Sequence, residues 1–457
     1  MKKFYAILFY LLSTITYAQT VSATFFGLAN KEIELIGFEG LETYLIAKTK
    51  ADEKGLFEVS FKSSDHGVGY LISEDRNPLF VILNAENLVI LGETFKKSKD
   101  INFIENNENQ FFSQYDKDNP RREQALGAWN YLEKIYRLDS LFSDYEHIKF
   151  TIQNEKKRII NEDKFLLEFL PKSSYVKWFL PIRKLVSSVE TIVQYRTEEI
   201  PETIIAFREL DYINPRLYKS GLFKDTIESH FWLIENSGYS LEKVSKEMKL
   251  SIDAIISKLL NDQKLLNEVT DYLFNLLERQ SLFIASEYLA LKMLNEENCT
   301  LNDDLSKQLE TYRTMSKGNI APDIIFESSK FANPSKTVTK LSELKYKYKL
   351  VVFSASWCSK CREEIPLIAN LYDKWKSKDL EVVLIAIEEN QKEFLNFYKT
   401  LPFPSYTELK NWKSKIVNDY FVYSTPTMFL LDDKRQIMLR PSSVKQIDSW
   451  VDWHLNN

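Results

Sequence analysis

Cysteine is scarce in this chain of 457 residues, which has only three, at positions 299, 358 and 361. So few cysteines exclude a framework of stabilising disulfides, which needs an even set of cysteines spread along the sequence. A zinc site built from two Cys-x-x-Cys pairs is excluded as well, because a second pair is missing. Two residues separate Cys358 from Cys361, whereas Cys299 stands alone and is predicted to be a free, partly buried thiol.

The four histidines, at positions 66, 147, 230 and 454, form no cluster in the sequence, which argues against a copper site. Haem attachment requires a histidine directly after the second cysteine, where this chain has Arg362. A peroxiredoxin has a threonine three residues before its reactive cysteine, and Ala355 occupies that position. A metal or haem role for the cysteine pair is therefore not supported.

An excess of positive charge is lacking too. The net charge is -5, with 60 Lys and Arg against 65 Asp and Glu, so nothing indicates binding to nucleic acid. After the first residues, no apolar run reaches the ~18 residues that a membrane helix needs.

The N-terminus has the three parts of an export signal. Lys2 and Lys3 form a short basic region, residues 4–12 are apolar, and Thr16 and Ala18 stand at the −3 and −1 positions of a cleavage site. Residues 1–18 are predicted to be a signal peptide, with an uncleaved first strand or anchor as the alternative. The mature protein, residues 19 onward, is then expected to be soluble and exported, in the periplasm.

Glycine is rare and unevenly distributed, since seven of the eleven glycines lie between Gly27 and Gly92. Short runs rich in Val, Ile, Leu, Phe and Tyr fill the same stretch, separated by turn residues. Such spacing predicts an all-β, sandwich-like domain over residues 19–115. The predicted strands are 21–26, 32–36, 43–47, 56–61, 69–72, 79–83 and 88–91.

Residues 116–315 are predicted to form a central α-helical region. Apolar residues recur there at helical spacing, for example at 252, 255, 256, 259 and 260, and prolines divide the segment into several helices. The region carries no chemical motif. It is interpreted as a packing or spacer region, with a partner-binding surface as the alternative.

From residue 316 to 457 strand and helix patterns alternate, which predicts a third, α/β domain. Strands are expected at 324–326, 350–354, 380–387, 427–431 and 436–439, and helices at 358–375, 391–398 and 444–454. The first long helix opens at residues 357–361, with the sequence WCSKC. There the free N–H groups and the helix dipole would stabilise a thiolate on Cys358, and Lys360 and Arg362 add positive charge. A thiolate beside a second thiol is equipped for disulfide exchange.

Two further motifs accompany the cysteine pair. Thr425 and Pro426 stand directly before the apolar strand 427–431, and Glu364-x-Pro366 lies inside the helix. With residues 321–323 (APD), the lead-in 337–344 and residues 353–361, they make the last third of the chain resemble the exported thioredoxin-like oxidoreductases of the TlpA and ResA type. Residues 19 to 95 look like the β-rich domain of unknown function that often precedes such domains.

The resemblance implies a role for each site residue. Cys358 would be the nucleophile, and Cys361 would resolve the mixed disulfide. A cis-Pro426 would lie against the pair, while Thr425 and Trp357 would contact an extended substrate. Cytoplasmic thioredoxins have an Asp six residues before the first cysteine, where this chain has Val352.

Glu364, six residues after the first cysteine, would instead exchange a proton with Cys361. The alternative for Glu364 is a solvated helix carboxylate. Ser359 and Lys360 replace the family's Gly-Pro or Glu-Pro. That dipeptide tunes the redox potential, so the direction of electron flow stays open.

The sequence therefore predicts an exported thiol-disulfide oxidoreductase, more readily a reductase, that acts on protein thiols and disulfides. The redox-active disulfide Cys358–Cys361 would be its only redox group, and a membrane electron donor would regenerate it. The alternative is a partner-binding protein with a vestigial or regulatory thioredoxin domain.

Overall fold

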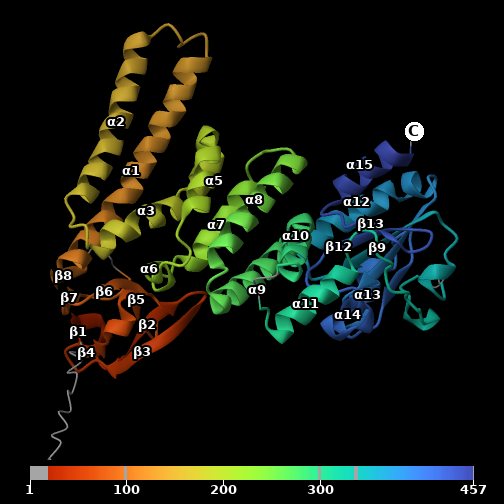
Figure 1. Cartoon of the computed structure of the whole chain (residues 1–457), viewed down its shortest axis with the longest axis horizontal. Helices are drawn as coiled ribbons and strands as arrows, with labels where there is room; N and C mark the ends of the chain where they lie inside the picture. The colour runs from red at the N-terminus through yellow and green to blue at the C-terminus, as the bar shows by residue number, and fades with distance from the viewer. Residues whose placement is uncertain (1–18, 97–99, 297–299, 334–337, 456–457) are drawn as a thin grey trace, which may run out of the picture. The chain divides into compact units, whose positions relative to one another are not determined.

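The computed structural model describes residues 19–96, 100–296, 300–333 and 338–455 (Figure 1). The predicted signal peptide and Cys299 lie outside the described residues. The chain divides into two compact units, residues 1–240 and 241–457. The helices predicted for the central region are thus shared between both units, and the predicted domain boundaries remain predictions.

The first unit begins with two four-stranded sheets, ordered β4-β1-β7-β8 and β3-β2-β5-β6. Pairs of neighbouring strands are antiparallel except β1 and β7, which run parallel. The strands are β1 (Gln19–Phe25), β2 (Glu32–Glu39), β3 (Glu42–Lys50), β4 (Leu56–Phe61), β5 (Gly67–Ser73), β6 (Leu79–Leu83), β7 (Leu88–Gly92) and β8 (Asn102–Glu105).

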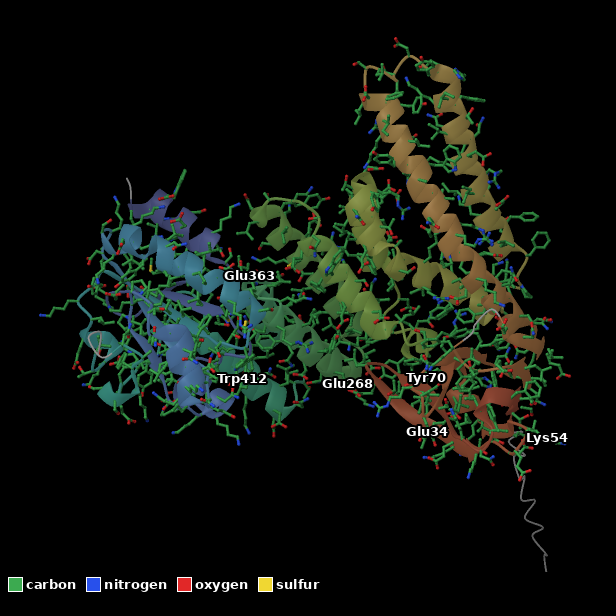
Figure 2. The ribbon with its side chains drawn as sticks, turned by 180° about the vertical axis from the view of Figure 1, so that it is seen from behind. Glu34, Lys54, Tyr70, Glu268, Glu363 and Trp412 are labelled. Atoms are coloured by element: carbon green, nitrogen blue, oxygen red, sulfur yellow. The ribbon has the colours of Figure 1, made fainter. Side chains whose placement is uncertain are left out.

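Both sheets contribute to one hydrophobic core, in which Val21, Leu35 and Ile90 are fully buried. Along β2 buried residues alternate with more exposed ones such as Glu34, which forms an ion pair with Lys48 (Figure 2). This alternation confirms the predicted all-β, sandwich-like domain. Strand β8 was not predicted, because its four residues are mostly polar or exposed and carry no alternating pattern.

Helices follow in the same unit, and the long α1 and α2 lie side by side as a hairpin (Figure 1). Helix α1 begins inside the range predicted to be β-rich, because Asn106 accepts the N–H of Asn109 and caps it. Asn109 also exchanges two hydrogen bonds of 2.8 Å with the backbone of Ile82, which ties α1 to β6. The helices are α1 (Asn107–Leu138), α2 (Glu146–Glu168), α3 (Tyr175–Ser187), α4 (Val189–Tyr195), α5 (Ile200–Glu209), α6 (Pro215–Tyr218) and α7 (Phe223–Glu235).

The second unit opens with α8 (Leu241–Leu259), α9 (Gln263–Arg279), α10 (Phe283–Leu294) and α11 (Asp303–Thr314). The apolar residues that predicted helices here are buried: Ile252, Ile255 and Leu259 on α8 are fully covered, as are Leu266 and Leu273 on α9. The helical prediction for this part of the chain is confirmed.

An α/β domain completes the second unit, with a sheet ordered β11-β10-β9-β12-β13. Strands β9, β10 and β11 are parallel, whereas β12 runs antiparallel to both of its neighbours. The elements are β9 (Tyr348–Ser354), α12 (Ser359–Lys376), β10 (Leu380–Ala386), α13 (Gln391–Tyr398), β11 (Ser405–Thr407), α14 (Lys415–Asp419), β12 (Thr427–Asp432), β13 (Ile437–Leu439) and α15 (Val444–Leu455).

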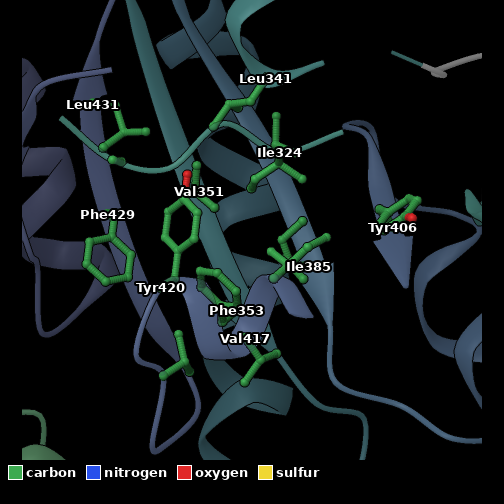
Figure 3. Close-up of a cluster of buried hydrophobic side chains, with 14 of the residues drawn as sticks. Ile324, Leu341, Val351, Phe353, Ile385, Tyr406, Val417, Tyr420, Phe429 and Leu431 are labelled. Carbon is green, nitrogen blue, oxygen red and sulfur yellow. The ribbon is translucent and has the colours of Figure 1, made fainter. Parts of the chain in front are cut away.

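Both faces of this sheet are covered, which explains why β9 reads as a continuous apolar run. Val351 and Phe353 point into a cluster shared with α14 (Figure 3). Val352 belongs to the opposite cluster, where α12, α13 and α15 pack. The predicted strand at 324–326 is wrong in extent, since Ile325 forms only an isolated bridge with Lys340. Strand β11 and helix α14 were not predicted, because three and five residues are too short for a periodic pattern.

Candidate active site

The Cys358 sulfur lies at the start of α12. Strand β9 ends at Ser354, and Cys358, in an extended conformation, is the N-cap of the helix. The N–H of Cys361 donates to the Cys358 sulfur over 3.2 Å. The sulfur therefore faces the positive end of the helix, where negative charge is stabilised.

The segment before β12 meets the cysteine pair. The thiol of Cys358 donates to the carbonyl oxygen of Thr425 at a distance of 3.2 Å. The peptide bond between Thr425 and Pro426 is cis, and β12 begins at the next residue. Residues from two distant motifs are thus brought together around one partly buried sulfur.

Cys361 lies one turn into the helix and is fully buried in the core cluster of α12. Burial, together with its hydrogen bond to Cys358, raises the pKa of the Cys361 thiol to about 12. Both cysteines are free thiols in this structure. Cys361 therefore carries its proton at neutral pH and must lose it before it can attack a disulfide.

The half-buried carboxylate of Glu364 has a different partner from the predicted one. Its Oε2 atom accepts the N–H of Val444, the first residue of α15, over 2.7 Å. Among the described residues, no hydrogen bond joins Glu364 to either cysteine. Its predicted role in proton exchange remains a prediction.

A second carboxylate, which the sequence analysis did not single out, contacts the loop between β9 and α12. Glu388 follows β10, is 1% exposed, and accepts the N–H of Ser356 over 2.6 Å. The hydroxyl of Tyr398 lies 3.5 Å from the same oxygen and 3.1 Å from the Ser354 hydroxyl. Burial raises the pKa of Glu388.

A signal for Glu388 existed in the sequence. It stands at the carboxyl end of the strand after the cysteine motif, and parallel strands place these ends on the same edge of a sheet.

The remaining predicted residues are exposed around the nucleophile. Ser359 and Lys360 are exposed in the first turn of α12. Trp357 is 51% exposed, and its ring centroid lies 6.1 Å from that of Trp412, a residue that the sequence reasoning did not single out. Arg362 does not point its Nε to the sulfur but donates it to the carbonyl of Ser356 over 2.7 Å.

Residues 346–437, which contain both cysteines and the cis-proline, match the family model described as "Thioredoxin-like". The sheet order and the helix α12, which Cys358 caps, agree with this match. The domain that contains residues 346–437 is thioredoxin-like. The predicted fold of this part of the chain is confirmed.

Several curated proteins are similar to this domain. "Thiol-disulfide oxidoreductase ResA" of Bacillus subtilis is 28% identical over 127 residues, which are 27% of this chain and 66% of that protein. "Sporulation thiol-disulfide oxidoreductase A" of the same species is 30% identical, over 22% of this chain and 64% of its own length. "Tryparedoxin" of Trypanosoma brucei brucei is 33% identical, over 20% of this chain and 65% of its own length. The chain thus spans less than two thirds of each relative.

Among solved structures, a thioredoxin-like protein from Bacteroides caccae is 16% identical, with a TM-score of 0.37, over 54% of this chain and 88% of that one. A putative "Thiol:disulfide interchange protein DsbE" from Chlorobium tepidum is 26% identical, with a TM-score of 0.25, over 29% of this chain and 89% of that one.

Proposed function

We propose that this protein is a thiol-disulfide oxidoreductase that exchanges disulfides with protein substrates through Cys358 and Cys361. One observation carries the proposal: the Cys358 sulfur lies between the start of α12 and the Thr425 carbonyl, with a buried second thiol one turn away. The relatives of the thioredoxin-like domain that are named oxidoreductases support the same activity.

The proposed reduction has two exchange steps. The Cys358 thiolate attacks one sulfur of the substrate disulfide, so that a Cys358–substrate disulfide forms and the other substrate sulfur leaves as a thiolate, which takes up a proton. Cys361 then loses its proton and attacks the Cys358 sulfur. The second substrate thiol is released, and two electrons have passed from the cysteine pair to the substrate.

The second step needs a group that accepts the proton of Cys361. By resemblance we propose Glu364, a residue about one turn after Cys361 in α12. Glu388 is a second candidate, because its buried carboxylate accepts the N–H of Ser356 in the loop that leads to Cys358. Variants of the two residues distinguish between them.

The cell location and the electron source also belong to the proposal. The pattern of residues 1–18 supports export to the periplasm, where a membrane electron donor would reduce Cys358–Cys361 and so favour a reductase. In the part of the chain that the structure describes, no helix is both long and apolar enough to cross a membrane.

A partner-binding protein is the second candidate function, and one feature of the first unit favours it. A cavity of about 600 Å³ lies there between the sandwich and the helices, lined by Phe80, Phe103, Phe112 and Phe179 among others. This volume is within the range of small-ligand sites, roughly 300–1,000 Å³.

Reduction of insulin by dithiothreitol, measured with wild type and Cys358→Ser, separates the two functions. The oxidoreductase proposal predicts acceleration by wild type only. If neither protein accelerates the reaction, and wild type shows no redox-dependent thiol labelling, the partner-binding function is favoured.

A further inference from the structure

Two tryptophans form an exposed aromatic surface beside the nucleophile. Trp357 precedes Cys358 directly and is 51% exposed, and Trp412 is 37% exposed. Their ring centroids are 6.1 Å apart, with an angle of 58° between the ring planes. Large aromatic side chains left in water next to a reactive group are typical of a binding surface, and tryptophan is enriched at the centres of interfaces.

The loop that carries Trp412, residues 408–414, is held in place by contacts with neighbouring elements. The N–H of Asn411 donates to the carbonyl of Glu388 over 3.1 Å, and its side-chain amide donates to Glu389 over 3.2 Å. Ser414 donates its hydroxyl to the carboxylate of Glu408 over 2.6 Å. The loop is thereby fixed to the end of β10, the strand beside the one that leads to Cys358.

The backbone of the same loop is strained. Leu409 and Asn411 have positive φ angles of 53° and 49°. Asparagine tolerates this left-handed region, but for leucine it is uncommon. Such conformations persist where the surroundings hold them, and they concentrate at functional sites. The strained backbone presents Trp412 to the solvent beside Trp357.

We infer that Trp357 and Trp412 bind an aromatic or aliphatic side chain that stands within two positions of the reactive cysteine in a substrate, and that Trp412 determines this specificity. The inference rests on the proposed oxidoreductase function. The surface is continuous with the site where the substrate cysteine must arrive, because Trp357 is the neighbour of Cys358. A residue in an extended segment advances by ~3.3 Å, so side chains one or two positions from that cysteine come within reach of the rings.

The test uses the full-length reduced protein in single-turnover reactions with three disulfides. Two are short peptides whose only cysteine is joined to 5-thio-2-nitrobenzoate, one with Phe and one with Ser at the flanking positions. The third is hydroxyethyl disulfide, which has no side chain to bind. Attack by Cys358 on the peptide sulfur releases coloured thionitrobenzoate, and Cys361 then releases the peptide thiol.

We expect wild type to react about tenfold faster with the Phe peptide than with the Ser peptide, as one apolar contact allows. Trp412→Ala should reduce this ratio to below about threefold, whereas Trp412→Phe should retain most of it. As a matched control, Trp453→Ala removes a tryptophan that is 73% exposed on α15 and should leave the ratio unchanged.

The reaction with hydroxyethyl disulfide distinguishes failure of the inference from failure of the proposed function. If all variants reduce it at the wild-type rate and Trp412→Ala keeps the full preference for Phe, the inference is wrong while the proposed function stands. Equal rates of wild type with both peptides would overturn it as well. If wild type reduces none of the three disulfides, the proposed function itself fails.

Discussion

The thiol of Cys358 donates a hydrogen bond to the carbonyl oxygen of Thr425 over 3.2 Å. Once Cys358 has lost its proton or formed a mixed disulfide, this carbonyl has no thiol donor. Under the proposed function, it would then be available to accept a backbone N–H from an extended substrate segment. The contact between the two residues would in that case link the state of the sulfur to substrate binding.

Replacement of the resolving cysteine should trap substrates. In Cys361→Ser the second exchange step is missing, so mixed disulfides between Cys358 and natural substrates should accumulate. Non-reducing gels followed by mass spectrometry of captured partners measure this. Cys358→Ser is the control and should capture none. Equal capture by the two variants, or no capture by Cys361→Ser, would contradict the assigned roles.

Glu364→Gln should slow the release step more than the first attack, if Glu364 accepts the proton of Cys361. Glutamine can still accept the N–H of Val444, so the start of α15 should be retained. Glu364→Ala loses that bond, and its free energy of unfolding should fall by about 0.5–2 kcal/mol. Stopped-flow kinetics of the first attack and of the release step measure this difference. Equal slowing of both steps would show that Glu364 is not the acceptor.

Glu388→Gln should change how stability depends on pH. Burial raises the pKa of Glu388 in the folded protein above its usual value of 4.5. Between these two pKa values the folded state binds more protons than the unfolded state, so the free energy of unfolding falls as the pH rises. Glutamine cannot ionise but can still accept the N–H of Ser356. The free energy of unfolding of the variant should therefore lack the part of the fall with pH that Glu388 causes in wild type.

Urea denaturation of wild type and Glu388→Gln from pH 4 to pH 8 measures the difference. We expect the variant to gain stability relative to wild type as the pH rises. Parallel curves would mean that Glu388 does not titrate with a raised pKa. If the same variant slows the release step while Glu364→Gln does not, Glu388 rather than Glu364 takes the proton of Cys361.

Helix α9 is joined to the thioredoxin-like domain by a buried ion pair. Arg440, directly after β13, lies 3.1 Å from the carboxylate of Glu278, and the two side chains are 6% and 2% exposed. The backbone carbonyl of Glu278 also accepts the hydroxyl of Ser424 over 3.1 Å, next to Thr425. The helices of the second unit thus support the segment that contacts Cys358.

Arg440→Leu leaves the Glu278 charge buried without its partner, so in the full-length protein the free energy of unfolding of the second unit should fall by about 3–5 kcal/mol. The control is Lys264→Leu, which removes an exposed ion pair with Glu268 (Figure 2) and should change stability by less than about 0.5 kcal/mol. Urea denaturation measures both. If Arg440→Leu lowers the free energy of unfolding as little as Lys264→Leu does, the buried pair does not stabilise the second unit.

Much of the site could be predicted from the sequence, because its signals are local. The apolar run of β9 followed by WCSKC predicted a helix from Cys358, which is the N-cap of α12, and Pro426 directly precedes β12. Glu388 and Trp412 carry no such local motif: Glu388 could be found only from the expected order of parallel strands, and Trp412 not at all. A carboxylate after a strand and a tryptophan in a loop read as surface residues until the fold places them beside Ser356 and Trp357.

The most direct test of the account is a redox titration of Cys358 and Cys361 against glutathione, read out by thiol labelling. Wild type should show one two-electron transition, absent in Cys358→Ser and Cys361→Ser. A potential nearer to about −270 mV than to about −120 mV would identify a reductase. Labelling of wild type that does not change with the potential would contradict the central claim that this pair is redox-active.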